Sequence, residues 1–451
     1  MYPLTFAEAA SILGKPSTDQ TKIEQVIIDS RQATAGSLFF ALPGSKTDGH
    51  HYVVDVLKSG GYAVVKRGWG QDQRVIEVED PLLALQKLAQ AHLEKIGLPV
   101  VAITGSNGKT TTKDFTAAVL GAKYKVCKTQ GSYNNEIGLP LTIMSIEPWH
   151  EVVVLEMGMR GLGEIRHLTE IAPPQVAVIT NIYPVHLELL GSIENIAKAK
   201  AEILLGLRSG GSAVLNGDDP LIRIHAAKAK HVLFYGRNGQ NQLRAENIAV
   251  DGQGKVSYDL RWNDQVYQVR LPVPGAHNVY NSLAAIGVGI QFGIPISIAI
   301  EALPETELSS MRLEIEFSSD GVLIINDAYN ASPASMQTAL ETLDQISGNR
   351  RKVAILGDMY ELGSLSDSAH EQVGVWAAQV CNQLVFVGKN AHLMNKGAQS
   401  AGFSSSNIRI YPTVEQLLVE LNQFVERQDS VLVKASRAVA LEQVVAALKA
   451  R

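Results

Sequence analysis

The sequence predicts an α/β protein with three domains, and three observations support that prediction. Short apolar runs rich in β-branched residues alternate with segments of helical periodicity along most of the chain, which is typical of parallel sheets covered by helices. The chain has 451 residues, enough for several domains of ordinary size. Residues 243–274 instead show strand after strand, with turns at 251–252 and 263–264, so an antiparallel excursion from the sheet is expected there.

The predicted domains differ in size and pattern. Residues 1–82 are expected to form a small α/β unit, residues 83–314 a central unit built on a P-loop-type parallel sheet, and residues 315–451 a Rossmann-like unit. The last unit has no Gly-x-Gly-x-x-Gly fingerprint, so a dinucleotide cofactor is not indicated.

The first unit begins with a helix signal. Thr5 and Glu8 form a capping box, and Gly14 ends the helix. Two polar stretches, residues 29–31 and 43–51, follow strands, where ligands commonly bind, although Asp-Ser-Arg at 29–31 is on its own more typical of a surface turn. Strands are expected at 26–28, 37–42, 62–66 and 75–78, with a helix at 53–58.

A helix is expected to lead from the first unit into the second. Asp80 is a suitable N-cap, Pro81 suits the first helical position, and Gly97 closes the helix.

Composition excludes several classes of protein. The net charge is −5 and the pI near 6.1, which gives no electrostatic case for nucleic-acid binding. Two cysteines cannot form a disulfide framework, so a reducing compartment is indicated. The N-terminus lacks the pattern of a signal peptide and no apolar run is long enough to span a membrane. We therefore expect a cytoplasmic protein, and a monomer.

The strongest single motif lies in residues 98–112. An apolar strand ending at Ile103 runs into a Gly-containing turn, and a helix begins at Lys109, an arrangement that presents backbone N–H groups to a polyphosphate. Lys109 would reach the terminal phosphates and the Thr110 hydroxyl would bind Mg²⁺. The usual pattern has Gly where Ile103 stands, so a Gly-rich turn with an incidental Lys-Thr is the alternative.

Two further polar residues follow apolar strands of the central unit. Glu156 ends one strand, and His186 lies in the loop after the next. Because the carboxyl ends of parallel strands meet at one edge, both should open onto the same crevice as Lys109, with Glu156 placed to organise Mg²⁺. The alternatives are a solvated strand end for Glu156 and a hydrogen-bonded loop histidine for His186.

The helix expected at residues 193–207 contains a lysine on its apolar stripe. Lys200 shares the face of Ile193 and Ile196, whereas Lys198 lies opposite. A lysine on a buried face is costly unless it is paired or neutral, so Lys200 is a functional candidate, with a plain surface lysine as the alternative.

Polar residues also mark the remaining elements. Asn278 and Asn281 share one face of a helix opening, where capping is the alternative role. Strands of the third unit end in the polar stretches 327–330, 357–363 and 434–437.

Together these stretches resemble the Mur ligase family of ATP-dependent amide-bond-forming enzymes. The resemblance covers the whole chain, and it depends on the order and spacing of motifs that are individually weak. These are Thr-Gly-Ser-Asn-Gly-Lys-Thr-Thr (104–111), Asn-Asn-Glu-Ile-Gly-Leu-Pro (134–140), Glu156, Thr-Asn (180–181) with His186, Lys200, Gly-x-His-Asn-x-x-Asn (275–281), Arg312 and Asp327.

Three stretches are similar to the family member that joins D-alanyl-D-alanine to UDP-N-acetylmuramoyl-tripeptide, a step in peptidoglycan synthesis. They are Asp-Ser-Arg (29–31) with Lys-Thr-Asp-Gly-His (46–50), Asp-Ala-Tyr-Asn-Ala-Ser-Pro-Ala-Ser-Met (327–336) and Leu-Gly-Asp-Met-x-Glu-Leu-Gly (356–363). Ala435 stands where the family commonly has Gly. Another amide ligase of the superfamily, such as the third-residue-adding Mur ligase or folylpolyglutamate synthetase, is the alternative, and a GTPase is disfavoured because Asn-Lys-x-Asp is absent. The sequence leaves open whether the third residue of the tripeptide is lysine or diaminopimelate.

The resemblance implies a role for each matching residue. ATP would be held by Gly105, Ser106, Asn107, Gly108, Lys109, Thr110, Thr111, Asn278, Asn281, Arg312 and Asp327. Lys109, Glu156, His186 and Lys200 would be catalytic, with one Mg²⁺ on Thr110 and Glu156 and a second on His186 and a carbamylated Lys200. The UDP substrate would contact Ser30, Arg31, Lys46, Thr47, Asp48, Asn134 and Asn135, and the dipeptide Tyr329, Asn330, Asp358, Glu361, Lys434, Ser436 and Arg437.

Overall fold

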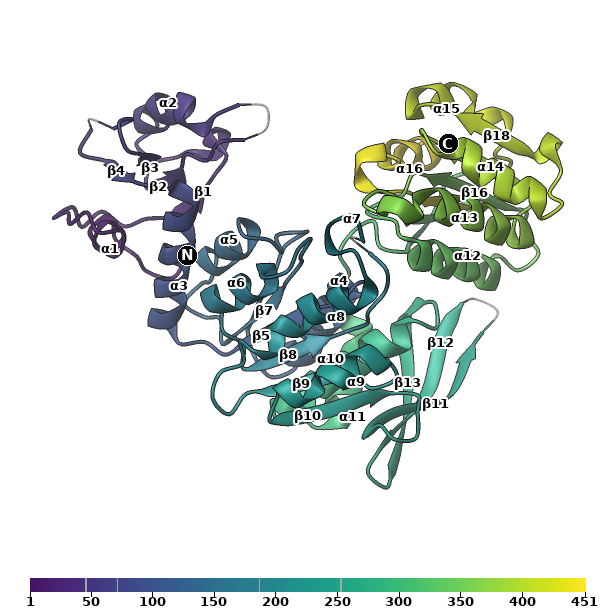
Figure 1. Ribbon diagram of the computed structural model, residues 1–451, viewed down its shortest axis with the longest axis horizontal. Helices are drawn as coiled ribbons and strands as arrows, with labels where there is room; N and C mark the ends of the chain where they lie inside the picture. The colour runs from purple at the N-terminus through teal and green to yellow at the C-terminus, as the bar shows by residue number, and fades with distance from the viewer. Residues whose placement is uncertain (45–46, 71, 186, 252–253) are drawn as a thin grey trace.

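A computed structural model describes residues 1–44, 47–70, 72–185, 187–251 and 254–451. Three separate sheets organise the chain, and Figure 1 shows the first and third at opposite ends of the central one. The mixed α/β architecture predicted from the sequence is confirmed, whereas the predicted domain limits at 82/83 and 314/315 stay predictions.

The N-terminal sheet is small and wholly parallel, with strand order β1-β2-β3-β4. The capping box is present: the Thr5 side chain accepts from the Glu8 backbone N–H, and the Glu8 carboxylate accepts from that of Thr5. The elements are α1 (Phe6–Ile12), β1 (Gln25–Ile27), β2 (Ser37–Phe40), α2 (Val53–Lys58), β3 (Tyr62–Lys66) and β4 (Val75–Val78).

Helix α3 (Pro81–Ile96) joins the N-terminal and central units. The Asp80 carboxylate caps its first turn, and Gly97 ends it with a positive φ of 74°. Its apolar face lies in one continuous core with strands of both units, which ties the two units together.

The central sheet has nine strands in the order β13-β12-β11-β10-β9-β8-β5-β7-β6. From β6 at one edge, through β7, β5, β8, β9 and β10 to β11, neighbouring strands pair in parallel. Strands β11, β12 and β13 pair antiparallel, which confirms the excursion predicted for residues 243–274. The strands are β5 (Val100–Thr104), β6 (Val126–Lys128), β7 (Val152–Glu156), β8 (Val176–Ile179), β9 (Ser212–Asn216), β10 (His231–Gly236), β11 (Leu243–Val250), β12 (Lys255–Trp262) and β13 (Gln265–Pro274).

Alternate residues of β5 face two different cores. Val100 and Ala102 pack with α3, α5 (Gly138–Met144), α6 (Glu164–Ile171) and α8 (Ile193–Lys200), whereas Val101 and Ile103 pack with α4 (Lys109–Gly121), α10 (Asn278–Gln291) and α11 (Ile296–Ala302). Burial on both faces is why these strands are apolar throughout. Helices α7 (Leu187–Leu190) and α9 (Pro220–His225) complete the described helices of this unit.

The C-terminal sheet has the order β14-β15-β19-β16-β17-β18, with only β14 antiparallel. Helices α12 (Pro333–Ser347), α13 (Ser366–Val380) and α14 (Ala391–Ser400) cover one face, and α15 (Val414–Glu420) and α16 (Glu442–Lys449) cover the other. The strands are β14 (Glu314–Phe317), β15 (Leu323–Asp327), β16 (Lys352–Gly357), β17 (Gln383–Val387), β18 (Ile408–Tyr411) and β19 (Ser430–Lys434).

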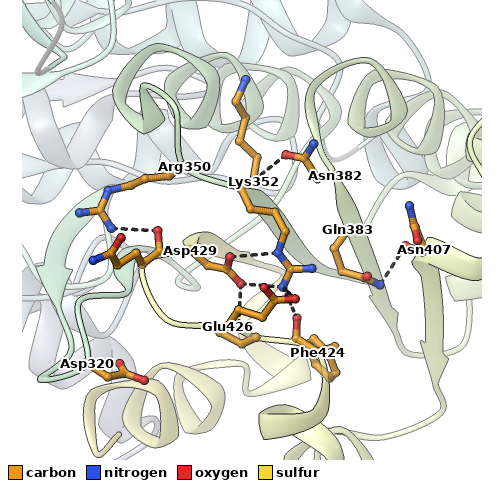
Figure 2. Close-up of polar contacts among 12 residues, drawn as sticks. Asp320, Arg350, Lys352, Asn382, Gln383, Asn407, Phe424, Glu426 and Asp429 are labelled. Carbon is orange, nitrogen blue, oxygen red and sulfur yellow. Dashed lines mark hydrogen bonds and ion pairs between the residues drawn. The ribbon is translucent and has the colours of Figure 1, made fainter.

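A polar network closes the amino end of this sheet, away from the strand ends that carry the predicted site residues (Figure 2). The Arg351 guanidinium donates to both oxygens of the buried Asp429 carboxylate at 3.0 and 2.8 Å, and to the Phe424 carbonyl at 2.6 Å. The Asn382 side chain accepts from the Lys352 backbone N–H at 2.8 Å. The network ties β16, β17 and β19 to the loop that precedes β19.

One local prediction was wrong, and one strand was missed. The helix expected at 193–207 is shorter, because α8 ends at Lys200 and tightens into a 3₁₀ turn, η3 (Ala201–Leu204). The edge strand β14 was not expected, although its four residues alternate between charged and apolar side chains and a turn at residues 318–321 follows it, because so short a run is a weak signal.

Candidate active site

A glycine turn joins β5 to α4, and its backbone needs glycine at two positions. Gly105 has a φ of 150°, and a Cβ there would lie 1.8 Å from the Thr180 hydroxyl. Gly108 has a φ of 77°, and a Cβ there would lie 2.5 Å from the Asn281 side-chain oxygen. The turn therefore packs directly against β8 and α10, and α4 begins at Lys109 with its N-terminus toward the turn.

The residues after β8 hold this turn in place. Asn107 donates its backbone N–H to the Asn181 side chain at 2.8 Å, and its carbonyl accepts from the Thr180 hydroxyl at 2.7 Å and from the Asn181 amide at 3.0 Å. The Ser106 hydroxyl bonds the Tyr183 backbone in both directions. Such a braced turn before a helix N-terminus is suited to bind phosphate.

Lys109, Thr110 and Glu156 come together as predicted. The Lys109 ammonium donates to the Gly105 carbonyl at 2.7 Å, and burial lowers the pKa of Lys109 although the Glu156 charge opposes that shift. Thr110 donates its hydroxyl to the buried Glu156 carboxylate at 2.9 Å, and the other Glu156 oxygen accepts from the Asn134 amide at 2.7 Å. A hydroxyl and a carboxylate this close are oxygen ligands of the kind that Mg²⁺ prefers.

Lys200 is buried, as its place on the apolar stripe predicted. Its side chain is 2% exposed, and burial together with the nearby Lys109 charge lowers the pKa of Lys200 well below its usual value. His186, the predicted partner of Lys200, lies outside the described residues. Within the residues that are described, no group of three or more His, Cys, Asp or Glu side chains could hold a metal ion.

A large cavity of about 1210 Å³ lies between the central and C-terminal units. It is lined from both sides, so a ligand held there would contact both units. The predicted site residues that line it are Ser106, Asn107, Gly108, Lys109, Thr110, Thr111, Asn134, Asn135, Glu156, Asn278, Asn281, Arg312, Asp327, Tyr329, Asn330, Glu361 and Lys434.

The C-terminal side of the cavity contains a buried ion pair. Lys434 pairs with Asp327, and its ammonium also donates to the Asn330 carbonyl at 2.8 Å. Burial lowers the pKa of Lys434, and the Asp327 charge opposes that shift. Arg312 lies over the Tyr329 ring, with its guanidinium carbon 4.1 Å from the ring centre. Cations from both units therefore face the same space, which suits anionic ligands.

Three family descriptions match successive parts of the chain. The Mur ligase family, catalytic domain matches residues 22–93, the Mur ligase middle domain residues 103–289, and the Mur ligase, glutamate ligase domain residues 311–437. A curated relative from Bacillus subtilis, UDP-N-acetylmuramoyl-tripeptide–D-alanyl-D-alanine ligase, is 38% identical over 96% of this chain and 94% of its own length.

This chain belongs to the Mur ligase family.

Other relatives of this Mur ligase agree with that result. The Escherichia coli protein with the same name is 33% identical over 100% of this chain and 99% of its own. A crystal structure of MurF from Acinetobacter baumannii has a TM-score of 0.89 at 29% identity, covering 100% of both chains. The MurF ligase of Thermotoga maritima in complex with ADP has a TM-score of 0.83 at 31% identity, covering 95% of this chain and 97% of its own. No helix in the described ranges of the ligase is long and apolar enough to cross a membrane.

Three residues predicted to bind the dipeptide do not line the cavity in this Mur ligase. The Asp358 carboxylate accepts the backbone N–H groups of Lys389 and Asn390, both at 2.9 Å. The Ser436 hydroxyl accepts the Tyr360 N–H at 3.0 Å, and the half-exposed Arg437 pairs with Glu442 at 3.1 Å. The structure thus gives all three other partners, and their contact with a dipeptide stays a prediction.

The residues predicted to bind the UDP substrate are divided between two places. Asn134 and Asn135 line the cavity, whereas Ser30, Arg31, Thr47 and Asp48 lie in the N-terminal unit. There Arg31 pairs with Asp29 at 2.7 Å, and the Asp48 carboxylate accepts from the His50 backbone N–H at 3.0 Å. Lys46 lies outside the described residues.

Several residues of the site had no role assigned from the sequence, although Thr180, Asn181 and Ser332 lie in stretches that carry the family resemblance. Asn181 and Thr180 brace the phosphate turn, and Ser332 of the C-terminal unit donates its hydroxyl to the Asn107 side chain at 3.3 Å. Asp218, after β9, lines the cavity and accepts the Tyr280 hydroxyl at 2.9 Å. The available signal was that polar residues directly follow β8 and β9, as Glu156 ends β7.

Proposed function

We propose that this Mur ligase joins D-alanyl-D-alanine to UDP-N-acetylmuramoyl-tripeptide, with ATP cleaved to ADP and phosphate by way of an acyl phosphate. The observation that supports this most directly is the cavity, where a phosphate-binding turn and Lys109 face Arg312 and Lys434 of the opposite side. The similarity over nearly the full length to relatives named UDP-N-acetylmuramoyl-tripeptide–D-alanyl-D-alanine ligase supports the choice of substrates. The buried free cysteines are consistent with a cytoplasmic location.

The first step activates the tripeptide. A terminal carboxylate oxygen attacks the γ-phosphorus of ATP, and the bond from that phosphorus to the bridging oxygen breaks, giving an acyl phosphate and ADP. Lys109 and Arg312 would offset the repulsion between the carboxylate and the triphosphate. Thr110 and Glu156 would hold Mg²⁺, which stabilises charge on the phosphates when bound.

The second step forms the amide. The neutral amine of the dipeptide attacks the acyl carbon, a tetrahedral intermediate forms, and phosphate leaves as the nitrogen loses its extra proton. Glu361 and Lys434 line the same cavity, and their carboxylate and ammonium groups would contribute to orienting the zwitterionic dipeptide. Burial between two units would also keep water from the acyl phosphate.

Product analysis tests this assignment. The enzyme is incubated with ATP, Mg²⁺ and UDP-N-acetylmuramoyl-tripeptide carrying either lysine or diaminopimelate, and with D-alanyl-D-alanine, L-glutamate or diaminopimelate as the amine. We expect phosphate release and a product of pentapeptide mass only with D-alanyl-D-alanine. Turnover with a shorter muramoyl peptide and a single amino acid, or with folate and glutamate, would instead assign the alternative ligase activities.

We further propose that Lys200 is carbamylated and provides an oxygen ligand for a second Mg²⁺ beside His186. The burial of Lys200 and its lowered pKa support this, because a neutral amine adds CO₂. Lys200→Ala should be inactive, acetate should partly restore it, and the wild type should slow when bicarbonate is removed. Rescue by a small alkylamine, with no effect of bicarbonate, would show that Lys200 acts as a cation.

A further inference from the structure

A buried cluster of charges lies on the helix that follows the phosphate turn. Lys113 and Asp114 are each 1% exposed, and the Lys113 ammonium lies 3.1 Å from the Asp114 carboxylate. Lys128, on the neighbouring β6, reaches the same carboxylate oxygen at 3.2 Å. We call these three residues the linker anchor. No step of the proposed reaction uses them.

The linker anchor binds the segment that connects the central unit to the C-terminal unit. This linker, residues 306–313, lies between the 3₁₀ turn η5 (Leu303–Glu305) and β14. The second Asp114 oxygen accepts the Ser309 backbone N–H at 2.8 Å, and Lys113 donates to the Ser309 hydroxyl at 3.1 Å. Lys128 donates to the Glu307 carbonyl at 3.2 Å. The central end of the linker is thus fixed by three hydrogen bonds, one to each residue of the linker anchor, at Glu307 and Ser309.

The other end of the linker is fixed by the C-terminal unit. Leu313 donates its N–H to the Asp327 carboxylate at 3.3 Å, and Met311 donates to the Glu314 carboxylate at 3.2 Å. Met311 and Leu313 have φ values of 60° and 51°, a left-handed backbone that L residues rarely adopt. Arg312 stands between these two strained residues and lines the cavity. Any rotation of the C-terminal unit about the linker must therefore pass through Ser310 to Leu313.

The spacing along α4 connects the linker anchor to the phosphate site. Lys113 follows Lys109 by four residues and Asp114 follows Thr110 by four, so each lies one turn beyond a predicted phosphate or metal contact. A buried ion pair contributes little net stability compared with apolar residues of similar volume, but it fixes the direction of its hydrogen bonds. This ion pair lies next to the linker and on α4, the helix whose first turn is predicted to hold the phosphates. Fixing the directions of its hydrogen bonds would therefore fix the linker relative to the phosphate site.

We propose that Lys113 and Asp114 are positioning residues, which hold the linker on α4 so that Arg312 enters the phosphate site in register with Lys109. This proposal rests on the proposed function, because it assigns Arg312 to the transferring phosphate. Lys113 and Asp114 do not line the cavity. They act through Ser309, whose backbone N–H donates to Asp114 and whose hydroxyl accepts from Lys113, so that movement of the C-terminal unit about the linker would be confined to the strained residues beside Arg312.

The test compares Asp114→Asn and Lys113→Met with a matched control. Thr116→Val changes another fully buried side chain of α4, one whose hydroxyl has no hydrogen-bond partner in the described part of the chain. Turnover, KM for ATP and the Kd of ADP are measured for each. We expect kcat to fall by a factor on the order of 100 for both anchor variants, as for a misplaced catalytic group, while ADP affinity stays within about twofold. Thr116→Val should match the wild type.

Domain position provides a readout that a loss of stability would not change. Dyes on Lys198→Cys and Ser400→Cys, both exposed, report the distance between the two units, since Cys127 and Cys381 are buried. Asp114→Asn should broaden the distribution of distances and weaken its shift on addition of ADP and Mg²⁺. A lower melting temperature with unchanged kcat and an unchanged distance distribution would overturn the proposal.

Two further variants separate the possible failures. Arg312→Ala tests the proposed function: full activity would remove Arg312 from the reaction, whatever the linker anchor does. If Arg312→Ala is inactive but Asp114→Asn is not, the positioning role alone is wrong. Should Asp114→Asn fail to fold, Ser309→Ala removes only the hydroxyl that Lys113 binds, and it should lower kcat without changing ADP affinity; an unchanged kcat would overturn the proposal.

Discussion

His92 should make the stability of this ligase depend on pH. It lies on α3, where its side chain is 1% exposed and, in the described part of the structure, neither ring nitrogen has a hydrogen-bond partner. Tyr2 packs edge-on against it, with ring centres 6.0 Å apart. Burial, helped by the Lys95 charge and opposed by the Glu8 charge, lowers the pKa of His92 from 6.5 to about 4. The folded protein therefore holds a neutral imidazole.

The sign and size of the effect follow from the two pKa values. In the unfolded chain the imidazole binds a proton below pH 6.5, whereas in the folded chain it does so only below about 4. Above pH 6.5 the imidazole is neutral in both states, so its protonation does not oppose folding. As the pH falls toward 4, only the unfolded chain binds the proton, and the free energy of unfolding decreases. One pKa unit corresponds to about 1.4 kcal/mol, so between pH 7 and pH 5 the protein should lose about 2 kcal/mol from His92 alone.

Urea unfolding at pH 7 and pH 5, followed by circular dichroism, measures this loss. Other groups titrate in the same range, so the informative quantity is the difference between the wild type and His92→Leu, which cannot bind a proton. The wild type should lose about 2 kcal/mol more than the variant. An equal loss in both proteins would refute the reasoning, because it would show that His92 is not held neutral.

Three more predictions follow from named contacts. Lys109→Ala should lower ligation about 10³-fold with an unchanged fold, because it removes a charge that neutralises the transferring phosphate, and near-normal turnover would contradict that role. Arg437→Ala should raise the KM for D-alanyl-D-alanine more than that for ATP, because a guanidinium can bind the dipeptide carboxylate. Arg437 pairs with Glu442 outside the cavity, so it would have to leave that partner; equal effects on both KM values would show that the dipeptide binds elsewhere. Asp429→Ala should lower the free energy of unfolding by about 3 kcal/mol, measured in urea, because it removes the buried carboxylate that accepts two hydrogen bonds from Arg351 and leaves only the exposed Glu426 as an ion-pair partner; the specific activity of the folded enzyme should not change, and a loss of activity at full stability would contradict a purely structural role.

Much of the fold was predictable where one local pattern decides the structure. The bounds predicted for α2, β3 and β4 match the structure, and the Asp80 cap and Gly97 stop define α3. Each of these signals is completed within a few residues. The edge strand β14 gave only a weak signal, because it is four residues long, only one neighbouring strand pairs with it and none of its side chains is buried.

The central side of the site was predictable because local patterns determine it. The contacts between the central and C-terminal units were not predictable in this way. Lys109, Thr110 and Glu156 follow strands that pair in one sheet, so sequence alone brings them together. The contact from Ser332 to Asn107 joins residues 225 positions apart on two different units. Nothing local to either residue determines it, since it depends on how the C-terminal unit is placed. The same dependence explains why the predicted dipeptide residues divided into those that line the cavity and those that do not.

The placement of the C-terminal unit also connects binding with catalysis. The cavity is bounded by both units, and its walls include Lys109 on one side and Lys434 on the other, both with pKa values that burial lowers. Burial of a lysine is unfavourable until an anion offsets it, so the triphosphate and the substrate carboxylate would stabilise the arrangement in which both lysines and Arg312 face them. Binding energy from the anionic parts of the substrates is then available to hold the units together. In the proposed function, the motif around Lys109 would bind the phosphates, and the linker with Arg312 would determine when the phosphate can be transferred.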